Sequence, residues 1–298
     1  MDELIGHEKM TRARFLAGAG LAAGAGALGA AAVSRRLPPG EWPGALAAAF
    51  RPEAREAPPS TTSVHHGELH SRTVPEPVPY AIVWPPGVRP GDPLPVCFAL
   101  PARGGGPPVW FAEPLAEAVG DDDVKAFALA AVAGGESYWH PRASGEDRLA
   151  MLLDEFIPRC AERYRLGEHR RAIIGWSMGG YGALLAAETR PELFAAVVAV
   201  SPAVWSSYAD MLRGPGDAFD GPADFARHDV IAHAGRLAGL RVRVDCGTED
   251  RFWRDVVRLT AVLPEPASGG FSKGGHGGDY WRGAAPAQVE FIGRALEG

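Results

Sequence analysis

From residue 78 onward, short apolar runs of strand length alternate with longer amphipathic runs of helix length. A short apolar run bounded by turn residues predicts a buried strand, whereas apolar residues spaced three and four apart predict a helix. Pro158 predicts a kink or an end within the first expected helix. The expected strands are 78–84, 95–100, 127–132, 172–175, 195–200 and 240–245, and the expected helices are 146–164, 178–190, 224–237, 253–263 and 285–296.

Strands that alternate with helices predict an α/β fold, in which a mostly parallel central sheet carries helices on both faces. In such sheets, ligands bind at the carboxyl ends of the strands. The residues that carry chemistry are therefore expected in the loops that follow strands.

The amino-terminal residues have the pattern of an export signal. Residues 15–33 are uncharged, consist almost wholly of Ala, Gly and Leu, and include a small-residue cleavage site at Ala30–Ala32. Thr11–Leu16 resembles a twin-arginine signal, with Ala13 between its two arginines. We predict that residues 1–36 direct export to the cell envelope or the medium. The alternatives are an uncleaved anchor that associates with the membrane and an Ala-rich helix on a cytoplasmic protein.

Residues 37–77 are rich in Pro, Ala, Ser and Thr and show no sustained period beyond a short Ala-rich piece near 44–55. This composition predicts a linker. The folded α/β domain is then expected at 78–298, and the length of 298 residues fits one such domain with additions at its amino-terminal side.

Charge and cysteine content exclude several classes of function. The net charge of −6 provides no basic footprint for nucleic acid, so no nucleic-acid partner is expected. The three cysteines are Cys97, Cys160 and Cys246, and they have no CxxC or CxxH spacing. We therefore expect neither a metal site nor a complete disulfide framework. Cys97 and Cys160 are expected to be buried, whereas Cys246 is less certain because it lies beside a candidate site loop.

Ser177 stands in the pentapeptide Gly175-Trp176-Ser177-Met178-Gly179, between an expected strand and an expected helix. A nucleophilic serine of an α/β-hydrolase occupies this strained strand-to-helix turn, where glycines leave room for the turn. A second match, with Ser272 at its centre in residues 270–274, follows no core strand and is interpreted as a chance match. Ser177 is therefore the candidate nucleophile.

A serine hydroxyl needs a base, which in this fold follows the nucleophile and the acid along the chain. Three histidines follow Ser177, and His228 and His233 fall within an expected helix. His276 lies in the run Gly274-Gly275-His276-Gly277-Gly278, whose flexibility allows the imidazole to reach over the end of the sheet. His276 is the candidate base.

The acid should lie in the loop after the expected strand 240–245, where it would hold the tautomer of the imidazole. Asp250 is preferred in the run Cys-Gly-Thr-Glu-Asp-Arg-Phe at 246–252. Glu249 remains the rival, and Asp245 is a further alternative that fits better as a hydrogen-bond acceptor at the end of the strand.

An oxyanion needs two N–H donors, and the N–H of Met178 directly follows the nucleophile. The second donor should come from the loop 101–106 after the expected strand 95–100. Because Pro101 has no N–H, we expect Arg103 or a neighbour to donate.

Aromatic residues follow two of the expected strands. Tyr138, Trp139 and Trp205 are candidates for lining a substrate pocket, and packing in the core explains them equally well.

Three separated motifs resemble those of the putative-esterase family, which includes esterase D (S-formylglutathione hydrolase) and the trehalose mycolyltransferases. They are Gly-Trp-Ser-Met-Gly-Gly-Tyr-Gly-Ala-Leu at 175–184, Asp-Cys-Gly-Thr-Glu-Asp-Arg-Phe at 245–252, and Gly-Gly-His276 followed by Tyr280-Trp281. The resemblance covers about residues 78–298 and implies an α/β-hydrolase fold. It also implies a triad of Ser177, Asp250 and His276 and a second oxyanion donor at Arg103.

These features together predict an esterase or thioesterase that needs no cofactor and acts on a small-molecule or lipid acyl ester. An acyltransferase that moves the acyl chain to a sugar or glycerol hydroxyl is the second hypothesis, as the mycolyltransferases suggest. A non-catalytic cell-envelope binding protein on a hydrolase scaffold is the third, because a fold does not fix a function.

Overall fold

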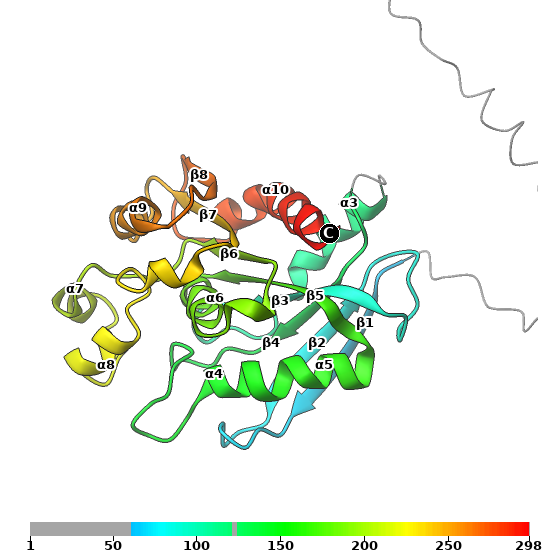
Figure 1. Ribbon diagram of the computed structural model, residues 1–298, viewed down its shortest axis with the longest axis horizontal. Coiled ribbons are helices and arrows are strands. Elements are labelled where there is room, and N and C mark those ends of the chain that lie inside the picture. Colours follow the sequence, from blue (N-terminus) through cyan, green and yellow to red (C-terminus); the bar gives the residue numbers. More distant parts are fainter. Residues whose placement is uncertain (1–60, 121–123, 298) are drawn as a thin grey trace, which may run out of the picture. The chain divides into compact units, whose positions relative to one another are not determined.

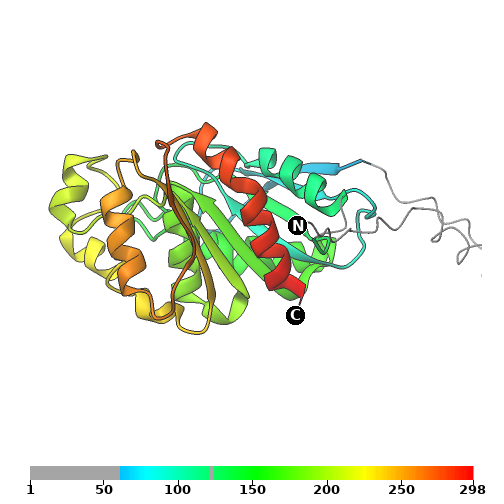
Figure 2. The same cartoon turned by 90° about the horizontal axis from the view of Figure 1, so that it is seen from above.

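The computed structural model describes residues 61–120 and 124–297, which form one mixed, mostly parallel sheet with helices on both faces (Figures 1 and 2). The strand order is β1-β2-β4-β3-β5-β6-β7-β8, and all neighbours from β4 to β8 run parallel. This arrangement confirms the expected α/β-hydrolase fold class. The strands are β1 (Ser63–Leu69), β2 (Val78–Trp84), β3 (Leu94–Leu100), β4 (Ala128–Val132), β5 (Leu166–Trp176), β6 (Ala196–Val200), β7 (Arg241–Gly247) and β8 (Ser268–Ser272).

The helices divide between the two faces of this sheet. On one face, α10 (Gly278–Glu297) crosses the sheet beside α3 (Ala112–Gly120) (Figure 2). The other face carries α4 (Arg148–Ala150), the π-helical segment η3 (Met151–Phe156), α5 (Ile157–Tyr164), α6 (Met178–Thr189) and α9 (Trp253–Val262). The short helices are η2 (Val109–Phe111), η4 (Pro191–Leu193), α7 (Tyr208–Arg213), α8 (Pro222–Arg227) and η5 (Ala234–Leu237).

The central strands are apolar on both sides because helices cover both faces of the sheet. Every residue of β4 and of β6 is buried. Their side chains divide between two cores, one beneath α5 and α6 and one beneath α3 and α10. This double burial produces the continuous apolar runs that the sequence shows.

Two expected helices differ from the observed ones. The expected end of a segment is found at Pro158, because the π-helical segment ends at Phe156 and Pro158 lies in the first turn of α5, where its missing N–H is no loss. The turn before it is π-helical, with the Ile157 N–H bonded to the Leu152 carbonyl. The expected helix 224–237 is wrong, since α8 ends at Arg227 and η5 begins only at Ala234. Between them the Asp229 carboxylate accepts local N–H bonds from residues 231 and 232, which compete with a helix.

The expected linker 37–77 extends too far, because residues 63–69 form strand β1. This strand pairs antiparallel with β2, from Ser63 opposite Trp84 to Leu69 opposite Val78. Its side chains are mostly exposed, so it has no apolar run, and ladder hydrogen bonds to β2 hold it instead. The amino-terminal boundary of the sheet therefore lies before residue 78.

The expected export signal at 1–36 and the linker up to residue 60 lie outside the described residues, so export stays a prediction. Within the described ranges, no helix is both long enough and apolar enough to cross a membrane.

Two glycines in helix interiors provide a matched test of the packing. A Cβ on Gly182 in α6 would lie 2.5 Å from Cγ of the fully buried Trp139, whereas a Cβ on Gly283 in α10 would meet open space. We expect Gly182→Ala to lower the free energy of unfolding by about 1–3 kcal/mol because the indole cannot move away. Gly283→Ala should raise it by about 0.5–1 kcal/mol. Urea unfolding measures the free energy of unfolding of both variants. Equal changes in the two would contradict the close packing of Gly182 against Trp139.

Glu188 in α6 predicts a pH dependence of stability. Both of its carboxylate oxygens are buried without a hydrogen-bond partner among the described residues, and burial raises its pKa to about 9. Arg236 opposes this shift and Asp229 adds to it. The folded protein thus keeps a proton that the unfolded chain releases above about pH 4.5, so stability falls as pH rises from there toward 9.

Glu188→Gln should remove this loss of stability at higher pH, because a side-chain amide does not ionise. We expect the variant to match the wild type near pH 4 and to exceed its free energy of unfolding by about 3 kcal/mol at pH 7. Glu192→Gln, at an exposed carboxylate bonded to Arg190, is the control. Urea titrations across this pH range that show a constant difference for Glu188→Gln would overturn the prediction.

Candidate active site

Ser177 lies at the turn between β5 and α6, with φ 56° and ψ −116°. This conformation is sparsely populated for a residue with a side chain and costs on the order of 1–3 kcal/mol. Three backbone hydrogen bonds hold it. The Ser177 N–H donates to the Val200 carbonyl at 2.9 Å, and the Ser177 carbonyl accepts the N–H groups of Tyr181 and Ala203, each at 3.0 Å. The backbone of β6 and of the loop after it therefore fixes the direction of the hydroxyl.

The two glycines of the pentapeptide allow this turn to be tight. A Cβ on Gly175 would collide with the carbonyl of Gly179, and a Cβ on Gly179 would collide with the carbonyls of Leu100 and Pro101. Neither obstacle is a flexible side chain, so only glycine fits. The same contact brings the loop after β3 against the first turn of α6.

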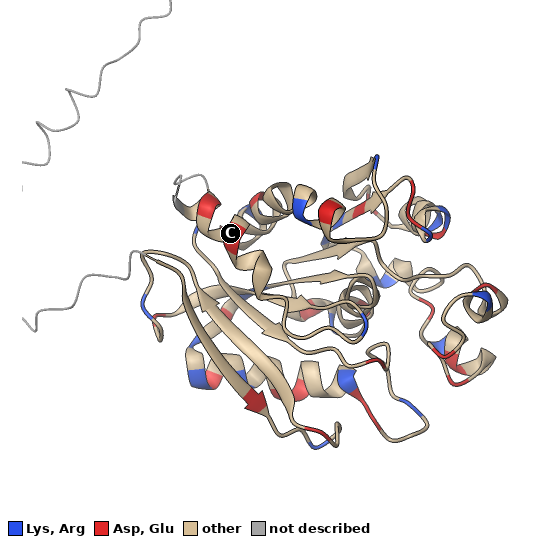
Figure 3. Cartoon of the chain, turned by 180° about the vertical axis from the view of Figure 1, so that it is seen from behind, with Lys and Arg blue, Asp and Glu red and all other residues tan. Residues whose placement is uncertain are grey.

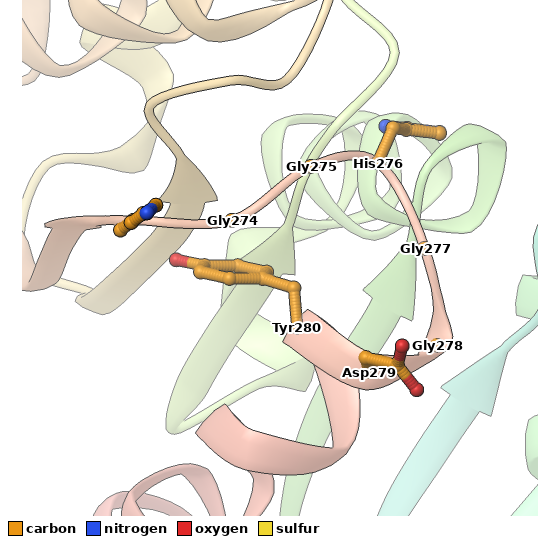
Figure 4. A pocket seen from close by; sticks show the side chains of 8 residues that line it. Gly274, Gly275, His276, Gly277, Gly278, Asp279 and Tyr280 are labelled. Carbon is orange, nitrogen blue, oxygen red and sulfur yellow. The ribbon is translucent and has the colours of Figure 1, made fainter.

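His276 projects from the glycine loop between β8 and α10, whereas Tyr280 lies beneath Gly274 (Figure 4). Its Nε2 lies 2.8 Å from Ser177 Oγ, and its Nδ1 lies 2.8 Å from Asp250 Oδ2. A carboxylate only accepts hydrogen bonds, so Nδ1 carries the proton and Nε2 is free to accept the serine proton. The structure thus brings together the three residues that the sequence predicted as a triad.

The loops of the acid and the base are bonded to each other through their backbones. The Thr248 N–H donates to the Ser272 carbonyl at 2.8 Å, and the Glu249 N–H donates to the Gly274 carbonyl at 2.9 Å. A Cβ on Gly247 would collide with that same carbonyl of Gly274. This close approach positions Asp250 beside the imidazole.

Asp250 is buried and accepts a second hydrogen bond, from the Phe252 N–H at 2.9 Å. Burial acts to raise the pKa of its carboxyl, but the hydrogen bonds from His276 and the Phe252 N–H outweigh burial and leave this pKa below its usual value. The carboxylate is therefore ionised at neutral pH and stabilises a positive charge on the imidazole.

The alternatives considered from the sequence occupy other roles. Asp245 accepts bonds from Arg243 at 2.8 and 2.9 Å and from Gln288 at 2.9 Å, as expected for an acceptor at a strand end. Glu249 is exposed, and its N–H donates to the glycine loop.

Ser272 is exposed at the end of β8, and no imidazole bonds to it among the described residues. His228 bonds to Asp224 at the end of α8.

The predicted oxyanion donors lie on the two segments that meet at Gly179. Met178 is the first residue of α6, where helical N–H groups have no partner within the helix. In the part of the chain that the structure describes, the N–H of Arg103 has no acceptor, and its loop is fixed by the bond from the Gly104 N–H to the Gly135 carbonyl at 2.8 Å. The Arg103 guanidinium donates two hydrogen bonds to the Asp217 carboxylate, at 2.9 and 2.6 Å.

The three candidate pocket aromatics separate into two environments. Trp139 is fully buried against Gly182 and Gly134, so it is a core residue and does not line a pocket. Trp205 lines a cavity of about 440 Å³, and its ring lies 5.7 Å from that of Tyr138. Tyr138 and Trp139 both have positive φ, at 58° and 57°, and such strained backbone is frequent near functional sites.

Two aromatic residues of the quoted motifs, to which the sequence assigned no role, are neighbours of His276. Phe252 and Trp281 pack edge-on against His276, with ring centroids 5.2 and 5.4 Å away. Trp281 also donates from Nε1 to the hydroxyl of the fully buried Ser201 at 3.2 Å. Phe252 had a detectable signal, since it lies two residues after the acid. Cys246 is buried, and burial raises the pKa of its thiol to about 12, so it is unreactive.

His140, Asp224 and His228 come nearest to a metal-ligand set among the described residues. The two imidazole rings stack 4.7 Å apart at 21°. A metal ion must lie near the plane of each ligating ring, so these stacked rings do not hold one ion together. The Asp224 carboxylate is instead bonded by Arg227 at 3.1 Å and by the Asp220 N–H at 3.0 Å.

Comparisons with known proteins identify the family to which the chain belongs. Residues 71–283 match the sequence model of the family described as Putative esterase. A ferulic acid esterase structure is 20% identical over 79% of this chain and 99% of that chain, with a TM-score of 0.67. An S-formylglutathione hydrolase from Agrobacterium tumefaciens is 15% identical over 80% and 96%, with a TM-score of 0.63.

Mycobacterium tuberculosis MPT51 (FbpC1) is 19% identical over 79% of this chain and 99% of that chain, with a TM-score of 0.59. At these identities the structural likeness concerns the fold. No curated protein sequence matches the chain significantly. The family match spans most of the chain, and it confirms the resemblance found in the motifs: the chain belongs to the Putative esterase family.

Proposed function

We propose that the chain is a serine esterase or thioesterase that hydrolyses an acyl ester through an acyl-enzyme on Ser177. One observation carries the proposal. Asp250, His276 and Ser177 form a continuous hydrogen-bonded chain, with 2.8 Å between acid and imidazole and 2.8 Å between imidazole and hydroxyl. This is the geometry that activates a serine nucleophile.

In the proposed reaction, Ser177 Oγ attacks the acyl carbonyl while His276 Nε2 takes the hydroxyl proton. The N–H groups of Met178 and Arg103 stabilise the negative oxygen of the tetrahedral intermediate. The imidazolium, held by Asp250, then gives its proton to the departing alcohol or thiol. Water attacks the acyl-enzyme with His276 again as the base, which releases the acid and restores the hydroxyl.

Acyl transfer would use the same acyl-enzyme, with a sugar or glycerol hydroxyl in the place of water. The intact hydrogen-bonded chain argues against a purely binding role. Hydrolysis is preferred because the structural neighbours include a ferulic acid esterase and an S-formylglutathione hydrolase, an ester and a thioester hydrolase by name.

We also propose that residues 1–36 direct export of the protein to the cell envelope or the medium.

Ser177→Ala removes the nucleophile and should lower the hydrolysis of short p-nitrophenyl esters by about 10⁶-fold and abolish labelling by a fluorophosphonate. Ser272→Ala, at the second match to the pentapeptide, should keep both activities. Mass spectrometry of the labelled, exported protein identifies the modified serine and the mature amino terminus together. Labelling that persists in Ser177→Ala would refute the assignment.

Asp250→Asn should lower kcat by about 10⁴-fold, because an amide at this position favours the wrong tautomer of His276. The neighbouring Glu249→Gln makes the same chemical change on an exposed side chain and should remain near the wild-type rate. Steady-state kinetics with p-nitrophenyl acetate distinguish the two. A larger loss in Glu249→Gln would transfer the role of the acid to Glu249.

A further inference from the structure

A basic cavity lies beside the triad, between the end of α7 and the start of α9. It has a volume of about 440 Å³. Figure 3 shows positive positions on both helices. The charged side chains that line the cavity are four arginines and two aspartates, namely Arg213, Arg251, Arg254, Arg258, Asp210 and Asp255. This excess of positive charge stands out in a chain whose net charge is −6.

The two aspartates neutralise only two of the arginines. Arg213 pairs with Asp210, and Arg258 pairs with Asp255 at 3.5 Å. Within residues 61–120 and 124–297, neither Arg251 nor Arg254 has a carboxylate at ion-pair distance. Both side chains are exposed, so they are available to an incoming anion.

Phe252 connects these cations to the reacting atoms. Its ring lies 5.2 Å from that of His276, and the Arg251 guanidinium lies 4.8 Å from its centroid. These two distances place the guanidinium at most about 10 Å from the imidazole. Arg251 also directly follows the acid Asp250 in the chain.

The wall between the cations and the triad is apolar. Trp205 packs edge-on against Phe252 at 5.5 Å. It lies two residues after Ala203, whose N–H bonds to the Ser177 carbonyl. Because His276 Nε2 lies 2.8 Å from Ser177 Oγ and the Arg251 guanidinium lies at most about 10 Å from the imidazole, a short acyl chain attached at Ser177 is long enough to bring a terminal carboxylate near Arg251.

We propose that this cavity binds a carboxylate carried on the acyl part of the substrate, with Arg251 and Arg254 as specificity-determining residues. The substrate class is then a half ester or half thioester of a short dicarboxylic acid, and this inference rests on the proposed function of Ser177. The planar guanidinium donates two parallel N–H bonds to a carboxylate, which neutral acyl chains cannot accept. Because the arginines are exposed, each ion pair contributes modestly, and a preference of about tenfold is expected.

The test compares two p-nitrophenyl esters with the same number of carbons in the acyl chain, the hemiglutarate and the valerate. The wild type should hydrolyse the hemiglutarate with about tenfold higher kcat/KM. The ratio should approach unity in Arg251→Gln/Arg254→Gln, and also at about 0.5 M sodium chloride, where exposed charges are screened. A wild-type ratio of one or less, or a ratio that survives the double substitution, would overturn the proposal.

Arg89→Gln is a control for the loss of one positive charge, to be compared with each single substitution Arg251→Gln and Arg254→Gln. It lies in the turn between β2 and β3, at the opposite ends of the strands from Ser177. It should leave both rates and their ratio unchanged. A ratio that falls equally in this control would show that net charge, and not the cavity, sets the preference, and would count against the proposal.

A binding measurement separates this inference from the proposed function. In a Ser177→Ala background, calorimetry with glutarate should detect binding that is lost on adding Arg251→Gln and Arg254→Gln. If the wild type hydrolysed neither ester, the proposed function would fail, and the glutarate titration would still decide on the cavity. Absent binding, or equal binding by both proteins, would overturn the anion site.

Discussion

The close approach of three backbone segments around Ser177 is the constraint on which the site depends. The end of β3 touches Gly179, and the carbonyl of Gly179 in turn touches Gly175. This crowding forces the positive φ of Ser177, and hydrogen bonds from β6 and the following loop hold it there. The strain is local, and the buried sheet that surrounds it supplies the stabilisation.

A second close approach brings Asp250 and His276 together. Gly247 and Gly274 bring the loop after β7 against the loop after β8, and backbone bonds tie the loops together. These contacts therefore hold Asp250 and His276 next to each other. The carboxylate of Asp250 is protected from solvent and still ionised, because its two hydrogen bonds compensate for its burial.

Charge is distributed unevenly around this centre. On the side of the oxyanion loop, Arg103 is neutralised by Asp217 in the segment before α8 and by Glu136 in the loop after β4. On the side of α9, Arg251 and Arg254 have no carboxylate partner among residues 61–120 and 124–297. The first arrangement fixes backbone geometry, whereas the second is the basis of the proposed anion site.

The sequence by itself determined the central strands, the strand-to-helix turn at Ser177 and the order of nucleophile, acid and base, because each of these depends on local pattern and chain order. It did not determine β1, whose exposed side chains give no periodic signal and whose place depends on pairing with β2. It left Glu249 open as a rival to Asp250, since a choice between adjacent carboxylates depends on which one the fold turns toward His276. The burial of Trp139 and the position of Arg251 over the ring of Phe252 beside His276 were likewise decided only by the tertiary structure, because both depend on residues far away in the chain.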